Sequence, residues 1–380
     1  MNFLQTLLNF SERAAKLARA IRQDPRLFSL LVEEKGELEK NKRFSQDFKT
    51  LADVLIQESL KYYVALKFPN LAEHVKGEEN SSFTNTLGEK IDVCICDSQN
   101  ETASLLAKAS FCWTSVLDGN VEAANILAEI VHGKIDDVEV KVELKSKVPP
   151  IILDNIGIWI DPIDSTSEYI HGNVGVIDPV SHIYHIGLPC VTVLVGVFDR
   201  ISGQPVAGVI NQPFAEKEST SSDVSWKSRI YWGINYSNVL LHSFPLPLTK
   251  SDKVNQKPFI VISNSENANL QNELKKQFGI IHATGAGYKS LVGSTFRWDT
   301  CAPHGILRSF GGGIISYKTL LELGQSQSLN TEEIGKRQIL YNKVNVDQGC
   351  TNDKWCNKDG IVVYKYPEIL TKVYESLKCL

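Results

Sequence analysis

The segment from 157 to 172, GIWIDPIDSTSEYIHG, constrains the fold of this chain more than any other. Its apolar residues, Ile158 to Ile160, are typical of a buried strand, and the run ends at Asp161. Pro162 disfavours helical backbone at the preceding residue, so we expect the strand to stay extended through Asp161. A second carboxylate, Asp164, follows after a turn. The sequence therefore predicts two acids where a buried strand ends.

Two hydroxyl residues, Ser165 and Thr166, come directly after these acids. Ser165 and Glu168 match a capping box, which predicts that a helix or turn begins here. On one interpretation, the first acid only ends the strand, and Asp164 or Ser165 only caps the helix. On the other, the strand end presents ligands for a cation, and the helix start receives an anion.

Other segments offer further candidates for the same site. Glu78 and Glu79 follow a glycine, and Asp299 stands at an expected helix start, with the glycines at 311–313 ending that helix. The glycine-containing stretch ATGAGYKS covers 283–290. Each of these features is weak alone, because an aspartate at a helix start is usually only a cap.

Converging carboxylates repel one another by about 4 kcal/mol per pair at 4 Å with an effective dielectric constant of 20. Such a cluster is stable only if cations neutralise it. Sites made entirely of oxygen ligands suit Mg²⁺. Two such ions roughly 4 Å apart would clamp a phosphate ester, activate water on one side and stabilise the leaving oxygen on the other.

Charge and cysteine usage exclude several classes of protein. The formal net charge is −4 and the isoelectric point is near 6.1, so we expect no nucleic-acid partner and no membrane surface. The eight cysteines are scattered, which favours reduced thiols in a cytoplasmic protein. Glu12, Arg13 and Lys16 interrupt the apolar run at the N-terminus, which is unlike a signal peptide, and no apolar stretch has the length of a membrane span.

Apolar periodicity predicts helices at 3–21 and 46–66. Asp53 lies off the apolar stripe of the second helix, so spacing alone indicates a solvated residue. The stretch 100–132 is predicted to be a helical insertion in two pieces, broken at 118–120, where the sequence reads Asp-Gly-Asn.

Hairpin signals dominate 188–234, where two alternating apolar runs flank the turn-rich sequence RISGQ and a third strand follows. The proline-rich and polar stretch 243–258 is the predicted boundary between two lobes. We expect an N-terminal α/β lobe at 1–245, with a large antiparallel sheet, and a C-terminal α/β lobe at 246–380, which begins with a strand at 259–263 and a helix at 267–277.

The motifs WIDPIDST, GEE, WD and GAGYKS together resemble the magnesium-dependent, lithium-inhibited phosphomonoesterases of the inositol monophosphatase superfamily. Within it, TLADVLIQE, GEENSSFTNTLGEKI, GVINQPF and YWGINY are similar to the branch of inositol polyphosphate 1-phosphatases. The resemblance covers nearly the whole chain. It implies an α/β (α+β) fold, arranged as a layered α/β/α/β/α sandwich, with the site between the lobes.

The resemblance also implies roles for individual residues. It implies two or three Mg²⁺ ions per site and Li⁺ as an inhibitor. The implied metal positions are Asp53, Glu78, Glu79, Asp161, the carbonyl of Ile163, Asp164 and Asp299. The implied catalytic residues are Glu78 and the pair that orients and deprotonates the attacking water, Asp53 and Thr166. The implied substrate-binding residues are Asp164, Ser165, Thr166, Ser265, Gly285, Lys289 and Asp299.

The chain departs from the family pattern in two places. Asn267 stands where the family usually has a lysine, so a cation near a second phosphate is absent. Only LVGSTFR lies between Ser290 and Trp298, which is too short for the usual helix end, strand and turn. We therefore expect the C-terminal sheet to be one strand short. This would misplace Asp299, and with it one metal ion.

The implied activity is hydrolysis of the 1-phosphate of inositol 1,4-bisphosphate and inositol 1,3,4-trisphosphate by a metal-activated water, in a protein that we expect to be a monomer. Two alternatives stay open. One is a 3′(2′),5′-bisphosphate nucleotidase acting on 3′-phosphoadenosine 5′-phosphate. The other is a catalytically impaired protein that only binds inositol phosphates, which the two departures motivate.

Overall fold

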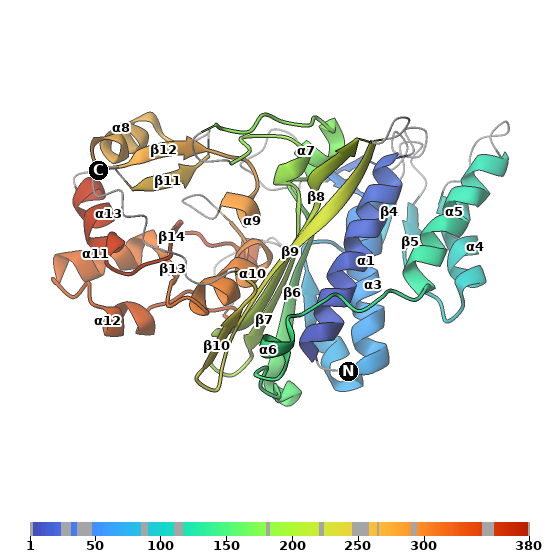
Figure 1. Ribbon diagram of the computed structural model, residues 1–380, viewed down its shortest axis with the longest axis horizontal. Coiled ribbons are helices and arrows are strands. Elements are labelled where there is room, and N and C mark those ends of the chain that lie inside the picture. Colours follow the sequence, from blue (N-terminus) through green and yellow to red (C-terminus); the bar gives the residue numbers. More distant parts are fainter. Residues whose placement is uncertain are drawn as a thin grey trace.

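The computed structural model describes the chain in eleven stretches: 3–23, 32–35, 48–84, 90–109, 117–179, 183–219, 224–244, 258–263, 266–289, 295–343 and 353–378. Helices and sheets alternate across the molecule (Figure 1). A pair of helices, a large sheet, a helix on its other face, two pairs of strands and an outer group of helices follow one another, and a further pair of helices lies beyond the first pair. This arrangement confirms the predicted layered α/β fold.

The large sheet has six strands in the order β10-β9-β8-β7-β6-β3. Only β3 and β6 run parallel, and the other neighbours are antiparallel, so the sheet is mixed. The hairpins β7–β8 and β8–β9 confirm the strands predicted within 188–234. The strand bounds are Val239–His242 for β10, Val224–Tyr236 for β9, Pro205–Ser219 for β8, Thr192–Asp199 for β7, Ile156–Asp164 for β6 and Val75–Gly77 for β3.

Helices α1 (Phe3–Gln23) and α3 (Leu51–Lys67) cover one face of this sheet and form the main apolar core with it (Figure 1). On the other face, α10 (Arg297–Arg308) packs directly onto β7 and β8. A Cβ atom on Gly208 would lie 2.0 Å from the carbonyl oxygen of Ala302, so only glycine permits this close approach. The large sheet thereby fixes the position of α10, which carries Asp299.

Two expectations for the N-terminal half need correction. Asp53 is 1% exposed, so it is not the solvated helix residue that spacing indicated. The helical insertion consists of α4 (Gln99–Ala109) and α5 (Leu117–His132), so 118–120 lie inside the first turn of α5 and do not break it. Asp and Asn are well tolerated near a helix start, where free N–H groups are available to their side chains.

Shorter elements complete this half. Strand β1 (Val32–Glu34) pairs with β2 (Phe48–Thr50), and β4 (Ser82–Thr84) pairs with β5 (Lys90–Asp92). The remaining helices here are α6 (Val142–Lys145) and α7 (Thr166–His171), with 3-10 turns at Pro69–His74, Leu153–Asn155 and Leu188–Cys190.

The described residues of the C-terminal part form two strand pairs. Strand β11 (Phe259–Ile262) and helix α8 (Ala268–Gln277) confirm the strand predicted at 259–263 and the helix predicted at 267–277. Strand β12 (Gly279–His282), which was not predicted, follows α8 and pairs with β11 in parallel. Strands β13 (Gly313–Ser316) and β14 (Ile361–Tyr364) are antiparallel. A second apolar core lies between these pairs and the helices α8, α11 (Tyr317–Gln325), α12 (Thr331–Lys336) and α13 (Ile369–Leu377).

A cavity of about 1240 Å³ is lined by both β11 and β14. Among the described residues these two strands pair only with β12 and β13, so the C-terminal strands form no continuous sheet. Residues 290–294 lie outside the described stretches, so the loss of one strand stays a prediction.

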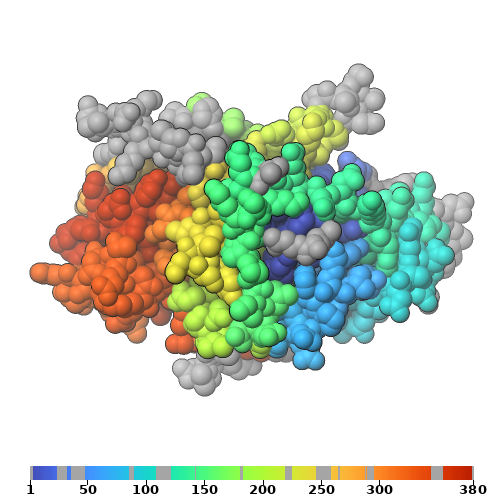
Figure 2. Space-filling view, turned by 60° about the horizontal axis from the view of Figure 1, so that its bottom comes forward, coloured from blue at the N-terminus to red at the C-terminus, as the bar shows by residue number. Residues whose placement is uncertain are grey.

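The N-terminal and C-terminal parts lie at opposite ends of the molecule, with the long strands between them (Figure 2). The predicted lobe boundary at residue 245 lies outside the described residues. Across the described stretches, every helix is too short or too polar to cross a bilayer.

Candidate metal centre

Strand β6 delivers two acids to one place because its pairing is irregular. Side chains three residues apart in a regular strand point to opposite faces. Between Asp161 and Asp164 the register of β6 against β7 shifts, which is the signature of a bulge. Pro162 lies within this irregular stretch, where a residue without an N–H is accommodated. The two carboxylates consequently face the same point.

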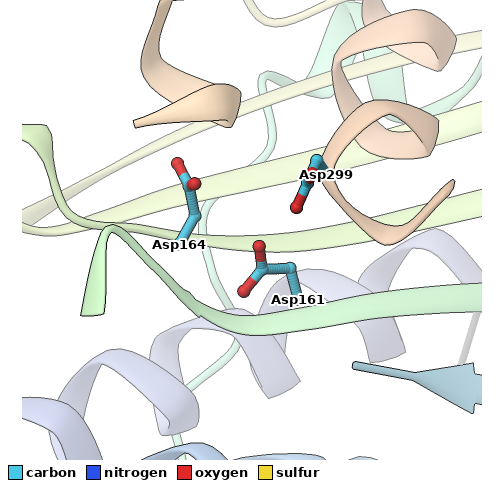
Figure 3. Close-up of side chains that lie close together, drawn as sticks. All are labelled: Asp161, Asp164 and Asp299. Carbon is cyan, nitrogen blue, oxygen red and sulfur yellow. The ribbon is translucent and has the colours of Figure 1, made fainter. Parts of the chain in front are cut away.

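Helix α10 supplies the third acid. Asp299 lies in its first turn, and its Oδ2 accepts a hydrogen bond of 2.7 Å from the N–H of Phe296. Ligand atoms of Asp161, Asp164 and Asp299 all lie within 4.8 Å of one another, and the carboxylates converge (Figure 3). Asp299 is therefore in place although the segment before it is short.

The donor set fits a hard cation. Asp161 is 2% exposed, and its Oδ1 is buried without a hydrogen-bond partner. Burying a carboxylate oxygen without a hydrogen-bond donor costs free energy, which a bound cation would offset. Mg²⁺ prefers sites made of oxygen ligands alone. The structure thus brings together three of the residues for which the resemblance implied metal binding.

A second group of acids follows β3. Because β3 runs parallel to β6, the N–H of Glu78 donates to the carbonyl of Ile160 at 3.3 Å. Ile160 directly precedes Asp161 in the chain, so Glu78 is held beside Asp161. Gln57 on α3 holds the neighbouring residue, Glu79, in place. Its Oε1 accepts from the Glu79 N–H at 3.0 Å, and its Nε2 donates to the Glu79 carbonyl.

A buried lysine contacts this second group. The Nζ atom of Lys35, directly after β1, lies 2.6 Å from Oε1 of Glu78 and 2.7 Å from Oε1 of Glu79. Lys35 is 6% exposed. It is therefore an internal counter-ion of these two acids.

Asp53 is held at the start of α3 by a capping box with Thr50. Its Oδ2 accepts from the backbone N–H of Thr50 at 2.7 Å and from the Thr50 hydroxyl at 2.6 Å. The expected proton-transfer partner, Thr166, instead donates from Oγ1 to the carbonyl of Ile163 at 3.0 Å. The two residues thus have different partners here, and their pairing stays a prediction.

Burial and mutual repulsion make the acids hold their protons. Burial raises the pKa of Asp53 to about 7 and that of Glu79 to about 8. Burial, with repulsion from Glu78 and Asp164, raises the pKa of Asp299 to about 8 and that of Asp161 well above its ordinary value. A cation entering this site would displace these protons.

Two of the predicted substrate-binding residues, Ser165 and Gly285, lie beside Asp164. Gly285 has φ +82°, and a Cβ atom there would lie 2.8 Å from Ser165 Oγ and 3.0 Å from Asp164 Oδ2. The next N–H, that of Ala286 at the start of α9 (Ala286–Lys289), donates to Asp164 Oδ1 at 2.9 Å. Gly285 is consequently required for the close approach of α9 to the acids.

The predicted capping box at α7 is wrong. Ser165 has φ 71° and makes no side-chain cap, because a capping serine needs extended backbone. The Glu168 carboxylate instead accepts from the N–H of Gly187 at 2.8 Å. Lys289 ends α9, but its side chain and the whole of Ser265 lie outside the described residues.

Sequence reasoning missed four residues that support the site. Thr192 Oγ1 donates to Asp164 Oδ2 at 3.0 Å. The others, described above, are Lys35, Thr50 and Gln57. Two of them had a readable signal. Gln57 follows Asp53 by one helical turn and so shares its face, and Thr50 precedes Asp53 at the spacing of a capping box.

The fold is layered α/β, and a strand end and a helix start bring acids around one point. Together these features define a class of proteins that bind cations. The chain belongs to the inositol monophosphatase family, whose family model matches residues 4–336. It is 42% identical over 391 residues to the mouse inositol polyphosphate 1-phosphatase and 40% identical over 394 residues to the human one. Both matches cover 96% of this chain and 94% of the relative. A 3′(2′),5′-bisphosphate nucleotidase from Dictyostelium discoideum is 29% identical over 182 residues, covering 42% of this chain and 51% of the relative.

Proposed function

We propose that this chain is a metal-dependent phosphomonoesterase that removes the 1-phosphate from inositol polyphosphates. The convergence of Asp161, Asp164 and Asp299 within 4.8 Å carries the proposal. The inositol polyphosphate 1-phosphatases that resemble this chain over 96% of its length support the substrate class. Inositol 1,4-bisphosphate and inositol 1,3,4-trisphosphate are the proposed substrates.

The acids would hold two or three Mg²⁺ ions. Asp161, Asp164, Asp299 and Glu78 are the proposed carboxylate ligands, and Glu79, Asp53 and the Ile163 carbonyl complete the set. Bound Mg²⁺ supplies positive charge for the phosphate oxygens and makes water a better nucleophile. Li⁺ would inhibit by entering the same acidic site.

Asp53 would accept the proton from the attacking water. Burial raises the pKa of Asp53 to about 7 in the metal-free protein, and a nearby cation would lower it, which leaves a carboxylate that can accept a proton. Thr166 would orient the water after exchanging its bond to the Ile163 carbonyl for one to the water. In this proposal Asp53 therefore accepts the proton and Thr166 positions the water.

Ser165, Thr166 and Gly285 would contact the substrate, with Ser265 and Lys289 beyond them. Among the described residues, Ser165 is one of four non-glycine residues with positive φ, a backbone conformation that costs free energy and often marks a functional site. Gly285 brings the next N–H, that of Ala286, within 2.9 Å of Asp164. These residues form the proposed phosphate-facing edge of the site.

Two alternatives are less well supported. The nucleotidase from Dictyostelium discoideum matches only 42% of this chain. An impaired binding protein was motivated by the short segment before Trp298, but Asp299 still reaches the other acids. At the second departure, Asn267 caps α8 by accepting from the Asn269 N–H at 2.8 Å, so it has a structural role of its own.

The test is release of inorganic phosphate from inositol 1,4-bisphosphate, with and without Mg²⁺. We expect turnover that requires Mg²⁺, falls with Li⁺ and nearly vanishes in Asp161→Asn. Faster release from 3′-phosphoadenosine 5′-phosphate would favour the nucleotidase. Calorimetric binding of inositol phosphates without turnover would favour the impaired binder. A cytoplasmic location and a monomeric state are further proposals, which fractionation and sedimentation would check.

A further inference from the structure

Lys35 occupies a position that the proposed mechanism does not use. It follows β1, which pairs with β2, and β2 leads directly into the start of α3 with Asp53. Its ammonium group lies 2.6 Å from one oxygen of Glu78 and 2.7 Å from one oxygen of Glu79. The side chain is only 4% exposed. A lysine buried to this degree needs paired carboxylates to be tolerated.

The Glu78 oxygen that contacts Lys35 belongs to a proposed metal ligand. A magnesium ion would approach such an oxygen to about 2.1 Å. An ammonium group and a divalent cation on the same carboxylate would repel each other strongly, because burial weakens dielectric screening. The two cations therefore oppose each other at Glu78.

We infer that Lys35 is a built-in competitor of the metal, contacting Glu78 and Glu79 in the metal-free protein and leaving Glu78 when a metal binds there. This inference rests on the proposed metal role of Glu78. Competition makes the two events reciprocal: whatever holds Lys35 on Glu78 weakens metal binding, and metal binding releases Lys35. Lys35 is thus a residue that sets the metal concentration at which the site fills.

The chain offers a matched control in Lys49 on β2. It is also buried, at 1% exposure, and its Nζ lies 3.0 Å from the Ser82 carbonyl and 3.3 Å from Oε2 of Glu33. These partners are not among the proposed metal ligands. Removing either lysine takes a buried cation out of the same region, but only the loss of Lys35 should change metal binding.

The first experiment is titration of Lys35→Met and Lys49→Met with Mg²⁺ in a calorimeter, beside the unaltered protein. We expect Lys35→Met to bind Mg²⁺ about tenfold more tightly, and Lys49→Met to stay within about twofold of the unaltered protein. Equal or weaker binding by Lys35→Met would overturn the inference. An unaltered protein that binds no Mg²⁺ would overturn the proposed function, and the inference with it.

The second experiment needs no variant, so it is decisive even if Lys35→Met does not fold. Acetic anhydride labels exposed lysines, and mass spectrometry reports the labelled fraction at each position. With Mg²⁺ present, labelling of Lys35 should rise at least threefold, while labelling of Lys49 stays constant. A Mg²⁺-saturated protein in which Lys35 stays as protected as without metal would contradict the inference while leaving the proposed function intact.

Discussion

Replacing Asp299 with asparagine should stabilise the metal-free protein while weakening its affinity for metal. The folded protein keeps a proton on Asp299 up to a pKa of about 8, whereas the ordinary value is 3.8. The stabilising contribution of a raised pKa is complete below the ordinary value and is lost as the pH rises towards the folded value. In Asp299→Asn this loss is absent, because an amide does not titrate.

The size of the effect follows from these two values. At pH 7 the difference of about 3.2 units from the ordinary 3.8 corresponds to a ceiling of about 4 kcal/mol, at 1.36 kcal/mol per unit. An amide also loses water on burial, so we expect a gain of about 2 kcal/mol. The amide oxygen can still accept from the Phe296 N–H, and its NH₂ can donate to Asp161 Oδ1, which has no partner.

The assay is urea unfolding with a chelator at pH 4 and pH 7, repeated at pH 7 with saturating Mg²⁺. Without metal, the gain should be near zero at pH 4 and about 2 kcal/mol at pH 7. With Mg²⁺, the order should reverse, because binding at 100 times the dissociation constant adds about 2.7 kcal/mol to the unaltered protein. The exposed Asp136→Asn should change stability by less than about 0.5 kcal/mol. Lower metal-free stability of Asp299→Asn at pH 7 would refute the reasoning.

Three further predictions concern the same site. Because the pKa values of Asp53 and Glu79 are raised to about 7 and about 8, the stability of the metal-free protein should fall between pH 5 and pH 8. Calorimetry in two buffers should also show that Mg²⁺ binding releases protons. The absence of proton release would count against protonated acids at this site. Gln57→Ala should cost about 2 kcal/mol of unfolding free energy, because two partly buried hydrogen bonds to Glu79 are lost, and urea unfolding would measure this. Gly285→Ala should lower phosphate release at least tenfold with an unchanged circular dichroism spectrum, since its Cβ would lie 2.8 Å from Ser165 Oγ; full activity would show that the close approach is dispensable.

The sequence predicted the parts of the fold that depend on local pattern. Alternating apolar runs around a turn identified the β7–β8 hairpin, and helical periodicity identified α1. The acids at 161 and 164 were predicted to meet Asp299, and they do. Such signals are readable because one apolar face or one turn specifies them.

The parts that could not be predicted depend on contacts between distant segments. Asp53 looked solvated because periodicity reports only the apolar stripe of α3, whereas in the fold Asp53 is buried and interacts with Glu78 and Lys35 from other segments. Lys35 gave no signal, since its contacts lie about 43 residues away at Glu78. The bulge in β6 arises from its register against β7, which a single strand does not encode.

Anomalous X-ray diffraction from crystals soaked in Mn²⁺, which replaces Mg²⁺ and scatters anomalously, tests the shared acidic site most directly. We predict a strong peak within about 2.5 Å of carboxylate oxygens from Asp161, Asp164 and Asp299 together. Crystals soaked in saturating Mn²⁺ that show no anomalous peak among these three side chains would contradict the account. Peaks found only elsewhere in the protein would contradict it equally.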